Sequence, residues 1–288
     1  MRKISIIFFF ALFGFFFFTY SSFQTEPKKE KNFCLSVIND MNDSSDKVKF
    51  IRYHVKALEK CGDKYLSAES DIKIETSPRK IYLKNPEKKI EMLYREGEHG
   101  NDALVKPPGF PYTSLYLNPY GSQMRKNQHY TIFELGFGFI AKTMRSILSK
   151  DPKNAQLITN LGIVNKFGQN CYMFMYDNKE FAYYDYKTTK GESVSTIATK
   201  KFLSDYMIRN KNNLSSYEGS IKEGTIIKLP NNYCKKAILF VSEKTKLPVA
   251  INLYDEKEIW ESYEFSNVIT NKPIDNAEFL KTWKDYKF

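Results

Sequence analysis

The sequence predicts a mainly β protein of the α+β class. Beyond the first 21 residues, 36 of 267 side chains are Phe, Tyr or Trp, an aromatic content that favours strands. Apolar segments of strand length recur between turn signals, roughly every 8–12 residues. Only one segment, 133–147, has a long helical pattern. With 27% charged and 42% hydrophobic residues, the 288-residue chain fits one large domain or two small ones, and its composition excludes wholesale disorder.

The N-terminal segment has the parts of an export signal. Arg2 and Lys3 precede the apolar run Ile4–Phe18, and residues 19–21 place small side chains at the −3 and −1 positions of a cleavage site. This run of 15 residues is shorter than the ~20 that a membrane span needs, so an uncleaved anchor is the lesser alternative. We therefore expect a signal peptide over 1–21 and a periplasmic or otherwise extracytoplasmic location.

The net charge and the cysteines limit which classes of binding partner and which cysteine chemistry are expected. The formal net charge is +11, or +9 without residues 1–21, and the basic side chains are dispersed. In an exported protein this balance disfavours nucleic acid as a partner. Anionic cell wall or lipid head groups fit it better, and a basic surface that serves only solubility fits it best. Cys34, Cys61, Cys171 and Cys234 permit two disulfides in three pairings, and their spacing matches no metal site. Because Cys34 follows charged residues outside the apolar run, the protein is not expected to be a lipoprotein.

The first elements follow a polar linker over 22–32. A helix is predicted over 32–41, where apolar residues have helical spacing before the turn residues 42–45. In 51–57, apolar residues alternate with polar ones, which predicts a strand, although the same segment also has partial helical spacing. Further strands are predicted at 68–76, 79–84 and 89–95.

The middle of the chain contains a loop and the clearest helix. Residues 106–121 are rich in Pro, Gly and Asn and predict a long ordered loop or a lid. After them, apolar residues between Phe133 and Ile147 fall on one face of a helix. The remaining predicted strands lie at 156–164, 170–177 and 179–187, and then at 235–241, 248–254 and 258–266.

The segment between these two groups of strands carries the most specific motif. Its members, in order, are Tyr186, Gly191-Glu192-Ser193-Val194, Ile197-Ala198, Leu203-Ser204, Ile208, Asn212 and the run from Gly224 to Pro230. Gly191 permits a tight turn from strand to helix, and Ser193 stands where it would cap the first helix. This segment resembles the LysM module, a small βααβ unit that binds N-acetylglucosamine glycans such as peptidoglycan.

The LysM resemblance covers Tyr186–Pro230, and 187–230 is the predicted insertion. It departs from the family at Glu192, where Asp is usual, and in a long polar loop over 213–220. It implies a glycan groove between two turns, with Gly191, Glu192, Ser193 and Val194 on one side and Tyr217 to Ile221 on the other. The alternative is a unit that keeps the fold and has lost the sugar site.

Three flanking stretches share residues with a second family: Pro78–Pro86; Leu117–Gly121 with Arg125 and Gln128-His129-Tyr130-Thr131; and Leu247–Val249 with Glu261–Phe265. Through them, 33–186 and 231–288 resemble an uncharacterised family of secreted bacterial proteins, distantly related to periplasmic lipoprotein carriers of the LolA type. The resemblance implies a curved antiparallel half-barrel sheet wrapped round a helix. It also implies a cleft for a hydrophobic ligand, either a lipid or a lipidated partner.

No HExxH, GxSxG or P-loop motif is present in the sequence. His54 is expected at the surface, His99 in a flexible turn, and His129 in a capping or structural role. We expect no enzyme activity, cofactor or metal. Two alternatives stay open: a wall-binding scaffold with a filled core, and a peptidoglycan hydrolase with two carboxylates. A cavity under 106–121 would favour a carrier of a hydrophobic ligand. A solidly packed interior would favour the scaffold, and two carboxylates that face each other across a cleft would favour the hydrolase.

Overall fold

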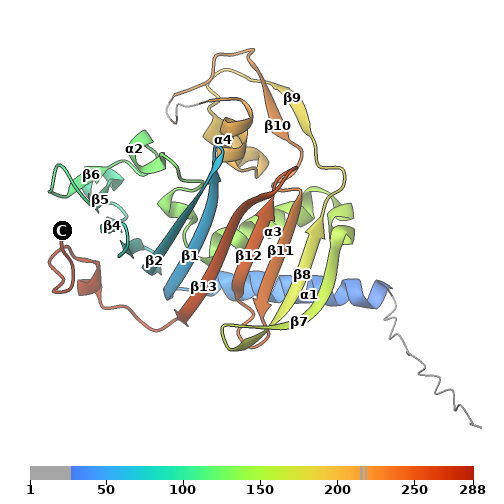
Figure 1. Cartoon of the computed structure of the whole chain (residues 1–288), viewed down its shortest axis with the longest axis horizontal. Coiled ribbons are helices and arrows are strands. Elements are labelled where there is room, and N and C mark those ends of the chain that lie inside the picture. Colours follow the sequence, from blue (N-terminus) through green and yellow to red (C-terminus); the bar gives the residue numbers. More distant parts are fainter. Residues whose placement is uncertain (1–26, 215–216, 218) are drawn as a thin grey trace, which may run out of the picture.

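An eleven-stranded antiparallel sheet dominates the computed structural model, which describes residues 27–214, 217 and 219–288 (Figure 1). The predicted signal peptide over 1–21 lies outside these residues. The strand order is β6-β5-β4-β3-β2-β1-β13-β12-β11-β8-β7. β1 to β6 form a consecutive meander, and the C-terminal strand β13 joins it to the second group by pairing with β1. Within the described chain, β6 and β7 are the two open edges. The predicted mainly β fold, with a curved and unclosed antiparallel sheet, is confirmed.

The elements have the following bounds. The sheet comprises β1 Phe50–Cys61, β2 Lys64–Thr76, β3 Arg79–Asn85, β4 Ile90–Arg95, β5 Ala103–Lys106, β6 Leu115–Leu117, β7 Ile158–Lys166, β8 Gln169–Asp177, β11 Lys236–Ser242, β12 Pro248–Tyr254 and β13 Ile259–Thr270. The main helices are α1 Pro27–Asp46, α2 Ser122–Arg125 and α3 Phe137–Lys150, with short 3₁₀ turns η1 His99–Asn101, η2 Ile132–Glu134, η3 Pro152–Leu157 and η4 Asn276–Phe279. A smaller unit comprises β9 Tyr183–Lys187, α4 Val194–Lys201, α5 Asp205–Lys211 and β10 Ile226–Pro230.

Residues 51–57 form part of strand β1, as their alternation of apolar and polar residues predicted. Ile51, Tyr53 and Val55 are buried, while the residues between them are partly exposed on the opposite face. On that outer face Arg52 forms an ion pair with Glu278, at 2.7 Å between Nη2 and Oε1. A helix would place the apolar and polar residues of this segment on mixed faces, whereas the period of two separates them completely.

Helices α1 and α3 pack against each other on the inner face of the sheet (Figure 1). The buried side of α1 joins the end of α3 and strands β7, β8, β11 and β12 in one apolar cluster. A second cluster lies under β1 to β4 and receives Phe137 from the start of α3. The core is therefore built from two clusters that share α3.

Helix α1 is longer than predicted and takes in residues 27–32 of the expected linker. Pro27 is tolerated in the first turn, where its missing N–H has no helical partner, and Glu30 suits the positive end of the helix. At the other end, the expected turn residues 42–45 stay helical. Ser45 Oγ donates to the Met41 carbonyl at 2.8 Å, and Arg145 of α3 pairs with Asp46, so contacts with α3 outweigh the local turn preference.

Helix α3 begins at Phe137, one turn later than the periodic pattern suggests. Gly136 precedes it with φ of 93°, a conformation that favours glycine, and an added Cβ would meet Ile74 Cδ1 at 3.4 Å. The Gly136 N–H donates to the Tyr53 hydroxyl at 3.1 Å. Phe133 lies instead in η2. The predicted loop over 106–121 also contains β6, the short edge strand.

The smaller unit has its own sheet and its own core. β9 and β10 pair antiparallel, and α4 and α5 pack on them through a separate apolar cluster. The predicted strand at 179–187 is therefore wrong as part of the main sheet, because β8 pairs directly with β11 and β9 pairs with β10. The small unit begins at Tyr183. The division into a main domain and an insertion stays a prediction.

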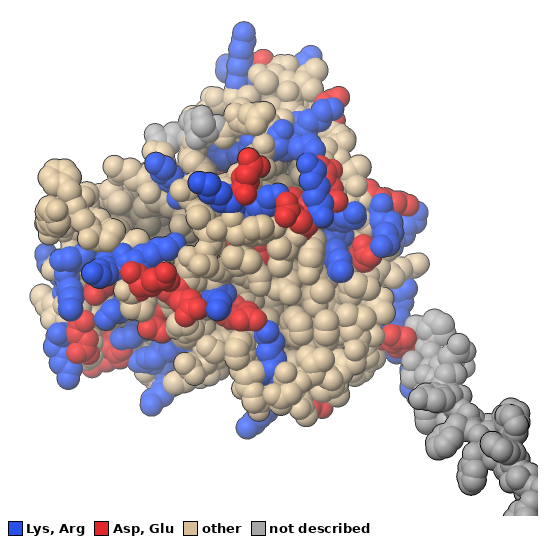
Figure 2. All heavy atoms as spheres, viewed as in Figure 1, with Lys and Arg blue, Asp and Glu red and all other residues tan. Residues whose placement is uncertain are grey.

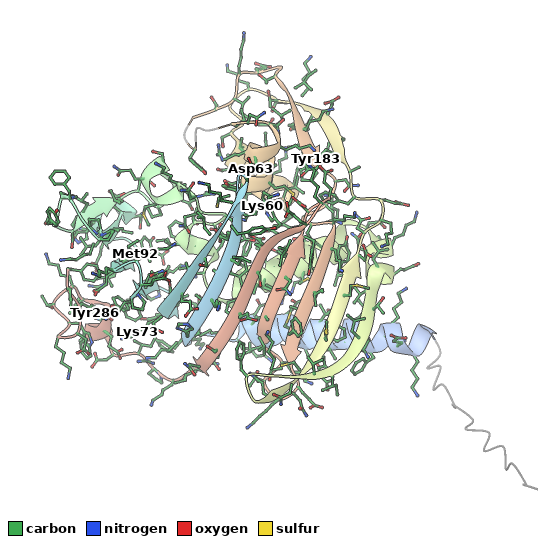
Figure 3. All side chains as sticks on the ribbon, in the orientation of Figure 1. Lys60, Asp63, Lys73, Met92, Tyr183 and Tyr286 are labelled. Carbon is green, nitrogen blue, oxygen red and sulfur yellow. The ribbon has the colours of Figure 1, made fainter. Side chains whose placement is uncertain are left out.

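The outer surface carries charges of both signs. In the view of Figure 2, Lys, Arg, Asp and Glu side chains are interspersed over the small unit and around β1 to β4. On the outer face of the sheet, the C-terminal segment returns over β2 and β3. Tyr286 stacks on Tyr82 at 3.8 Å between ring centroids, and Lys73 lies beside it (Figure 3). All four cysteines are free thiols, so the two permitted disulfides are not formed. Among the described residues, no helix is long and apolar enough to cross a bilayer.

Replacing residues 183–230 by an Asn-Gly turn should leave the main sheet folded. The Asn231 N–H already donates to the Ala182 carbonyl at 2.9 Å, so the two chain ends are placed for a short hairpin connection. Circular dichroism should show retained strand content and a cooperative melt at a lower temperature, since the main domain loses its contacts with α5. A chain without any cooperative transition would contradict the predicted division.

Candidate functional site

A cavity of about 460 Å³ lies between the sheet and α3. Most of its wall is apolar and comes from strands at the centre of the sheet and from α3; representative residues are Val55, Ile72, Met92, Ile140, Leu253 and Phe265. Met92 is labelled in Figure 3. Exposed polar side chains, Lys88, Gln123, Lys126 and Gln128, mark the mouth. Leu117 and Pro119 also line the cavity, so it borders the predicted loop over 106–121.

A fully buried ion pair, His129 with Glu261, lies beside this cavity. Nδ1 of His129 is 2.8 Å from Glu261 Oε2, and Nε2 is 2.9 Å from the Lys60 carbonyl oxygen. Both partners accept hydrogen bonds, so both ring nitrogens carry protons. Burial acts to lower the pKa of His129, but hydrogen bonds with Cys61 and Glu261 and the charges of Glu261 and Glu59 outweigh it and raise that pKa to about 10. His129 is an imidazolium here.

Three tyrosines extend the network around Glu261 and Glu59: the hydroxyls of Tyr130 and Tyr263 bond the carboxylates, and that of Tyr233 bonds Tyr130. Tyr130 donates to Glu261 Oε1 at 2.5 Å and accepts from Tyr233, whose hydroxyl is 2.6 Å away. Tyr263 lies 2.5 Å from Glu59 Oε1 and 3.2 Å from Glu261 Oε2. Burial raises the pKa of all three phenols well above their usual value, with the neighbouring carboxylates adding to the shift. They therefore stay protonated donors, and all three rings line the cavity.

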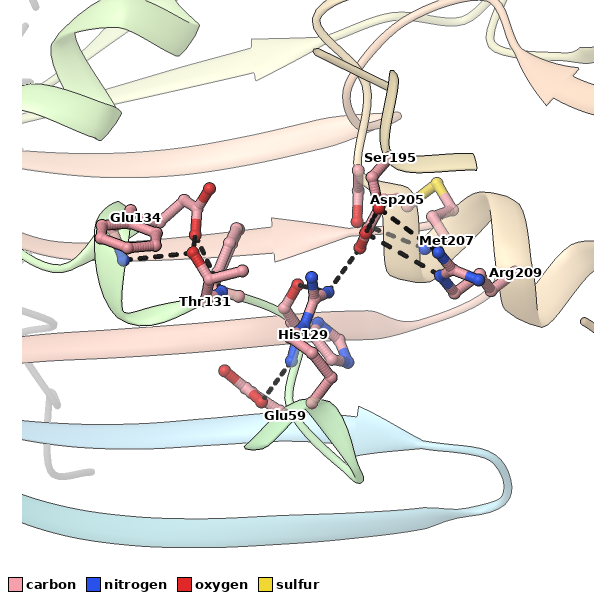
Figure 4. A network of polar contacts seen from close by, with 12 residues as sticks. Glu59, His129, Thr131, Glu134, Ser195, Asp205, Met207 and Arg209 are labelled. Carbon is pink, nitrogen blue, oxygen red and sulfur yellow. Dashed lines mark hydrogen bonds and ion pairs between the residues drawn. The ribbon is translucent and has the colours of Figure 1, made fainter. Parts of the chain in front are cut away.

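The two carboxylates are direct neighbours in the sheet. Glu59 of β1 and Glu261 of β13 are paired across the strands. Like charges in such a position repel, so the protons of His129 and Tyr263 are required to hold them together. The main-chain N–H of His129 also donates to Glu59 Oε2 at 3.0 Å (Figure 4).

Helix α5 of the small unit covers this network. The Tyr206 ring stacks on His129 at 4.3 Å between ring centroids. Next to it, Arg125 Nη2 is 2.7 Å from Asp205 Oδ1, and only 4% of the Arg125 side chain is exposed. Ser195 of α4 donates to the other Asp205 oxygen at 3.1 Å. The small unit is thus joined to the main sheet by a stacked ring and a buried ion pair.

The polar atoms of this network are already used in hydrogen bonds with one another. Glu59, Cys61 and His129 place their donor atoms within 4.8 Å of one another, as metal ligands could. However, the Glu59 carboxylate already accepts two hydrogen bonds, and both His129 nitrogens donate. A metal would require His129 to lose a proton. Glu59 and Glu261 share the Tyr263 hydroxyl, so these two carboxylates lie side by side and do not face each other across a cleft.

The turn predicted to bind glycan is present in the small unit. Gly191 has φ of 80°, and Ser193 caps α4 by accepting from the Thr196 N–H. The Glu192 carboxylate accepts from the Thr189 N–H and the Tyr186 hydroxyl, each at 2.8 Å, and these bonds lower the pKa of Glu192. Its side chain is therefore already engaged.

Of the remaining predicted glycan residues, one joins this turn and two point elsewhere. The Ile221 N–H donates to the Glu192 carbonyl at 2.7 Å, which brings the two predicted sides of the groove together. Val194 is buried in the core of the small unit. Tyr217 lies against Arg125 and Arg209, with its ring centroid 5.2 and 4.7 Å from their guanidinium carbons. That ring belongs to the junction with the main domain.

Comparison with known proteins gives a family of unknown function and distant structures. Residues 54–190 match the family described as protein of unknown function (DUF1571). No curated protein matches the chain. The lipoprotein LppX of Mycobacterium tuberculosis is 10% identical, with a TM-score of 0.41, 85% of this chain covered and 98% of that one. LprF from Mycobacterium bovis is 10% identical, with a TM-score of 0.43 and coverages of 86% and 95%.

A putative outer membrane lipoprotein-sorting protein domain from Vibrio parahaemolyticus is 9% identical, with a TM-score of 0.35 and coverages of 88% and 97%. TM-scores below 0.5 carry no argument about function. The fold is described from the strand order of this chain itself.

The stability of the protein should depend on the His129 proton. The pKa of His129 is raised from about 6.5 in the unfolded chain to about 10, so its contribution is full below about pH 6.5 and is lost as pH rises through 10. The unfolding free energy of wild type minus that of His129→Gln should therefore shrink between about pH 7 and 10, by up to ~1.4 kcal/mol per pH unit.

Urea unfolding at several pH values measures this difference. In a Glu261→Gln background the pH dependence of the same comparison should become weaker, because the paired carboxylate is gone while Cys61 and Glu59 still raise the pKa of His129. A constant difference from pH 7 to 10 in the wild-type background would show that His129 is not held as an imidazolium.

Proposed function

We propose that this is an exported, non-enzymatic cell-envelope protein that holds a hydrophobic ligand in the cavity between the sheet and α3. The ligand class is an acyl chain, carried by a lipid or a lipidated partner. The cavity volume of about 460 Å³ falls in the range of ~300–1,000 Å³ that is usual for ligand pockets. Each buried methylene contributes about 0.8 kcal/mol, so about ten would supply roughly 8 kcal/mol before the cost of ordering is subtracted.

The polar part of the wall supports an apolar ligand. The hydroxyls of Tyr130, Tyr233 and Tyr263 are engaged with each other or with the buried carboxylates, so they offer no free donor to a ligand. The mouth differs, because Lys88 and Lys126 have no ion-pair partner among the described residues. An amphiphile with its chain inside and an anionic head group at the mouth fits this distribution.

The two alternatives fit less well. A wall-binding scaffold with a filled core would leave no apolar volume of this size beside α3. A hydrolase needs two carboxylates on opposite sides of a bond, about 5–10 Å apart. Glu59 and Glu261 instead share one tyrosine hydroxyl, and the Glu261 side chain is fully buried.

Filling the cavity should weaken ligand binding. Ala57 and Ala68 are cross-strand partners on β1 and β2, and both line the cavity. Ala57→Phe or Ala68→Phe should weaken binding of a fluorescent fatty acid analogue by about tenfold or more, because the added ring takes the volume of several methylenes.

The matched control is Ser67→Phe, next to Ala68 on β2 but exposed and outside the cavity lining. It should bind the probe as the wild type does. Cooperative melting of all three variants shows that they fold. Equal affinity in the filled and control variants would refute the carrier proposal.

We further propose that the small unit binds peptidoglycan or another N-acetylglucosamine glycan. Two features support this second site: the βααβ order, and the bond from Ile221 to Glu192 that brings the two turns together. Tyr217 was predicted to line the groove, but it is left out of the proposed site because its ring lies at the junction with the main domain.

Purified peptidoglycan should therefore pellet the protein even at about 1 M salt, where charges are screened beyond roughly 3 Å. Ser220→Trp, at an exposed position beside Ile221, should block the groove, whereas Asp185→Trp on β9 should not. If salt alone releases the unmutated protein, binding is electrostatic and the unit has kept the fold without the sugar site.

A further inference from the structure

The hairpin of β5 and β6 carries an unusually apolar tip. Residues 107–124 contain no charged side chain, although charged residues make up 27% of the chain. Within this run, Phe110 is 86% exposed and Tyr112 is 78% exposed. Their rings contact each other edge to face at 6.3 Å between centroids, and neither ring belongs to a core cluster. Folding thus leaves two large aromatic side chains in water.

The tip is held in place by its own hydrogen bonds. The Tyr112 N–H donates to the Gly109 carbonyl at 2.8 Å, which closes a tight turn around Phe110. Below it, β5 and β6 pair through three residues on each strand. The hairpin projects from the end of the sheet in Figure 1, and the same end is uncharged at its tip in Figure 2, with basic side chains beside it.

We propose that this tip, Pro107–Ser114, docks the protein on a lipid bilayer by inserting Phe110 and Tyr112 at the head-group level. Phe and Tyr suit this depth, because an aromatic body enters the apolar layer while the Tyr hydroxyl stays in the polar one. Lys106 and Lys126 flank the apolar run, and no carboxylate pairs with either among the described residues. They complement anionic head groups, each at about 1 kcal/mol near the surface.

The shape of the tip favours a bilayer over a protein partner. A stable protein interface buries about 800 Å² on each side, and a single turn with two rings offers far less than that. A few inserted side chains together with basic neighbours are enough for reversible membrane binding. Val105 and Leu117, on the same hairpin, line the cavity. Docking by the tip therefore brings the cavity mouth close to the lipid.

Fluorescence from a tryptophan placed at the tip tests insertion of the tip in the full chain. It reports on position 112 even if the apolar residues 4–18 also bind lipid. In the Tyr112→Trp variant, the added tryptophan emission should shift to shorter wavelength on mixing with vesicles of phosphatidylglycerol and phosphatidylcholine. Brominated lipid in these vesicles should quench it. Phe167→Trp is the matched control, because Phe167 is also an exposed aromatic, at 52%, but lies between β7 and β8 at the other edge of the sheet. It should not be quenched. No quenching at position 112, or equal quenching at both, would overturn the proposal.

Affinity gives the second test. Phe110→Ser with Tyr112→Ser should lower the vesicle partition coefficient by about tenfold or more, while the fatty acid analogue in detergent-free buffer binds with unchanged affinity. That separation distinguishes failure of docking from failure of the carrier function. If the fluorescence change at position 112 instead follows protein concentration without vesicles, the tip binds a second copy and the bilayer proposal is wrong.

Discussion

The buried carboxylate of Glu261 is the constraint on which the arrangement of this molecule depends. An unpaired buried carboxylate costs several kcal/mol, and its cross-strand neighbour Glu59 adds a like charge. The compensating protons come from His129, Tyr130 and Tyr263. His129 and Tyr130 lie on the segment between α2 and η2, so this segment is held against β1 and β13. The carboxylate thereby positions α3, which follows directly.

The same constraint explains how the small unit sits on the main sheet. Excluding water strengthens each hydrogen bond of a fully paired network, although it also raises the desolvation cost, and α5 supplies that cover. Tyr206 stacks on His129, while Asp205 neutralises Arg125, whose side chain is nearly fully buried. The small unit therefore also covers buried side chains of the main domain. The contacts with the main domain come from α5 and from Tyr217, whose ring lies against Arg125.

Local sequence patterns were sufficient for most strands and for the small unit, and insufficient for the site. The alternation around Tyr53 and the turn at Gly191 depend on neighbouring residues, so a single sequence contains them. The pairing of His129 with Glu261 joins residues 132 positions apart and leaves no local signal. Contacts with other elements also reversed local preferences, since α1 continues through its turn residues where Arg145 contacts Asp46. A cavity has no sequence pattern at all, because it is volume left by packing.

The buried charge also fixes part of the wall of that cavity. The rings of Tyr130 and Tyr263 are not free to fold away, because each hydroxyl must stay within hydrogen-bond distance of a carboxylate. Tyr130 in turn packs edge to face on Phe139 of α3, at 5.1 Å between centroids. The polar network thus fixes two aromatic rings of the cavity wall, one of them in contact with α3.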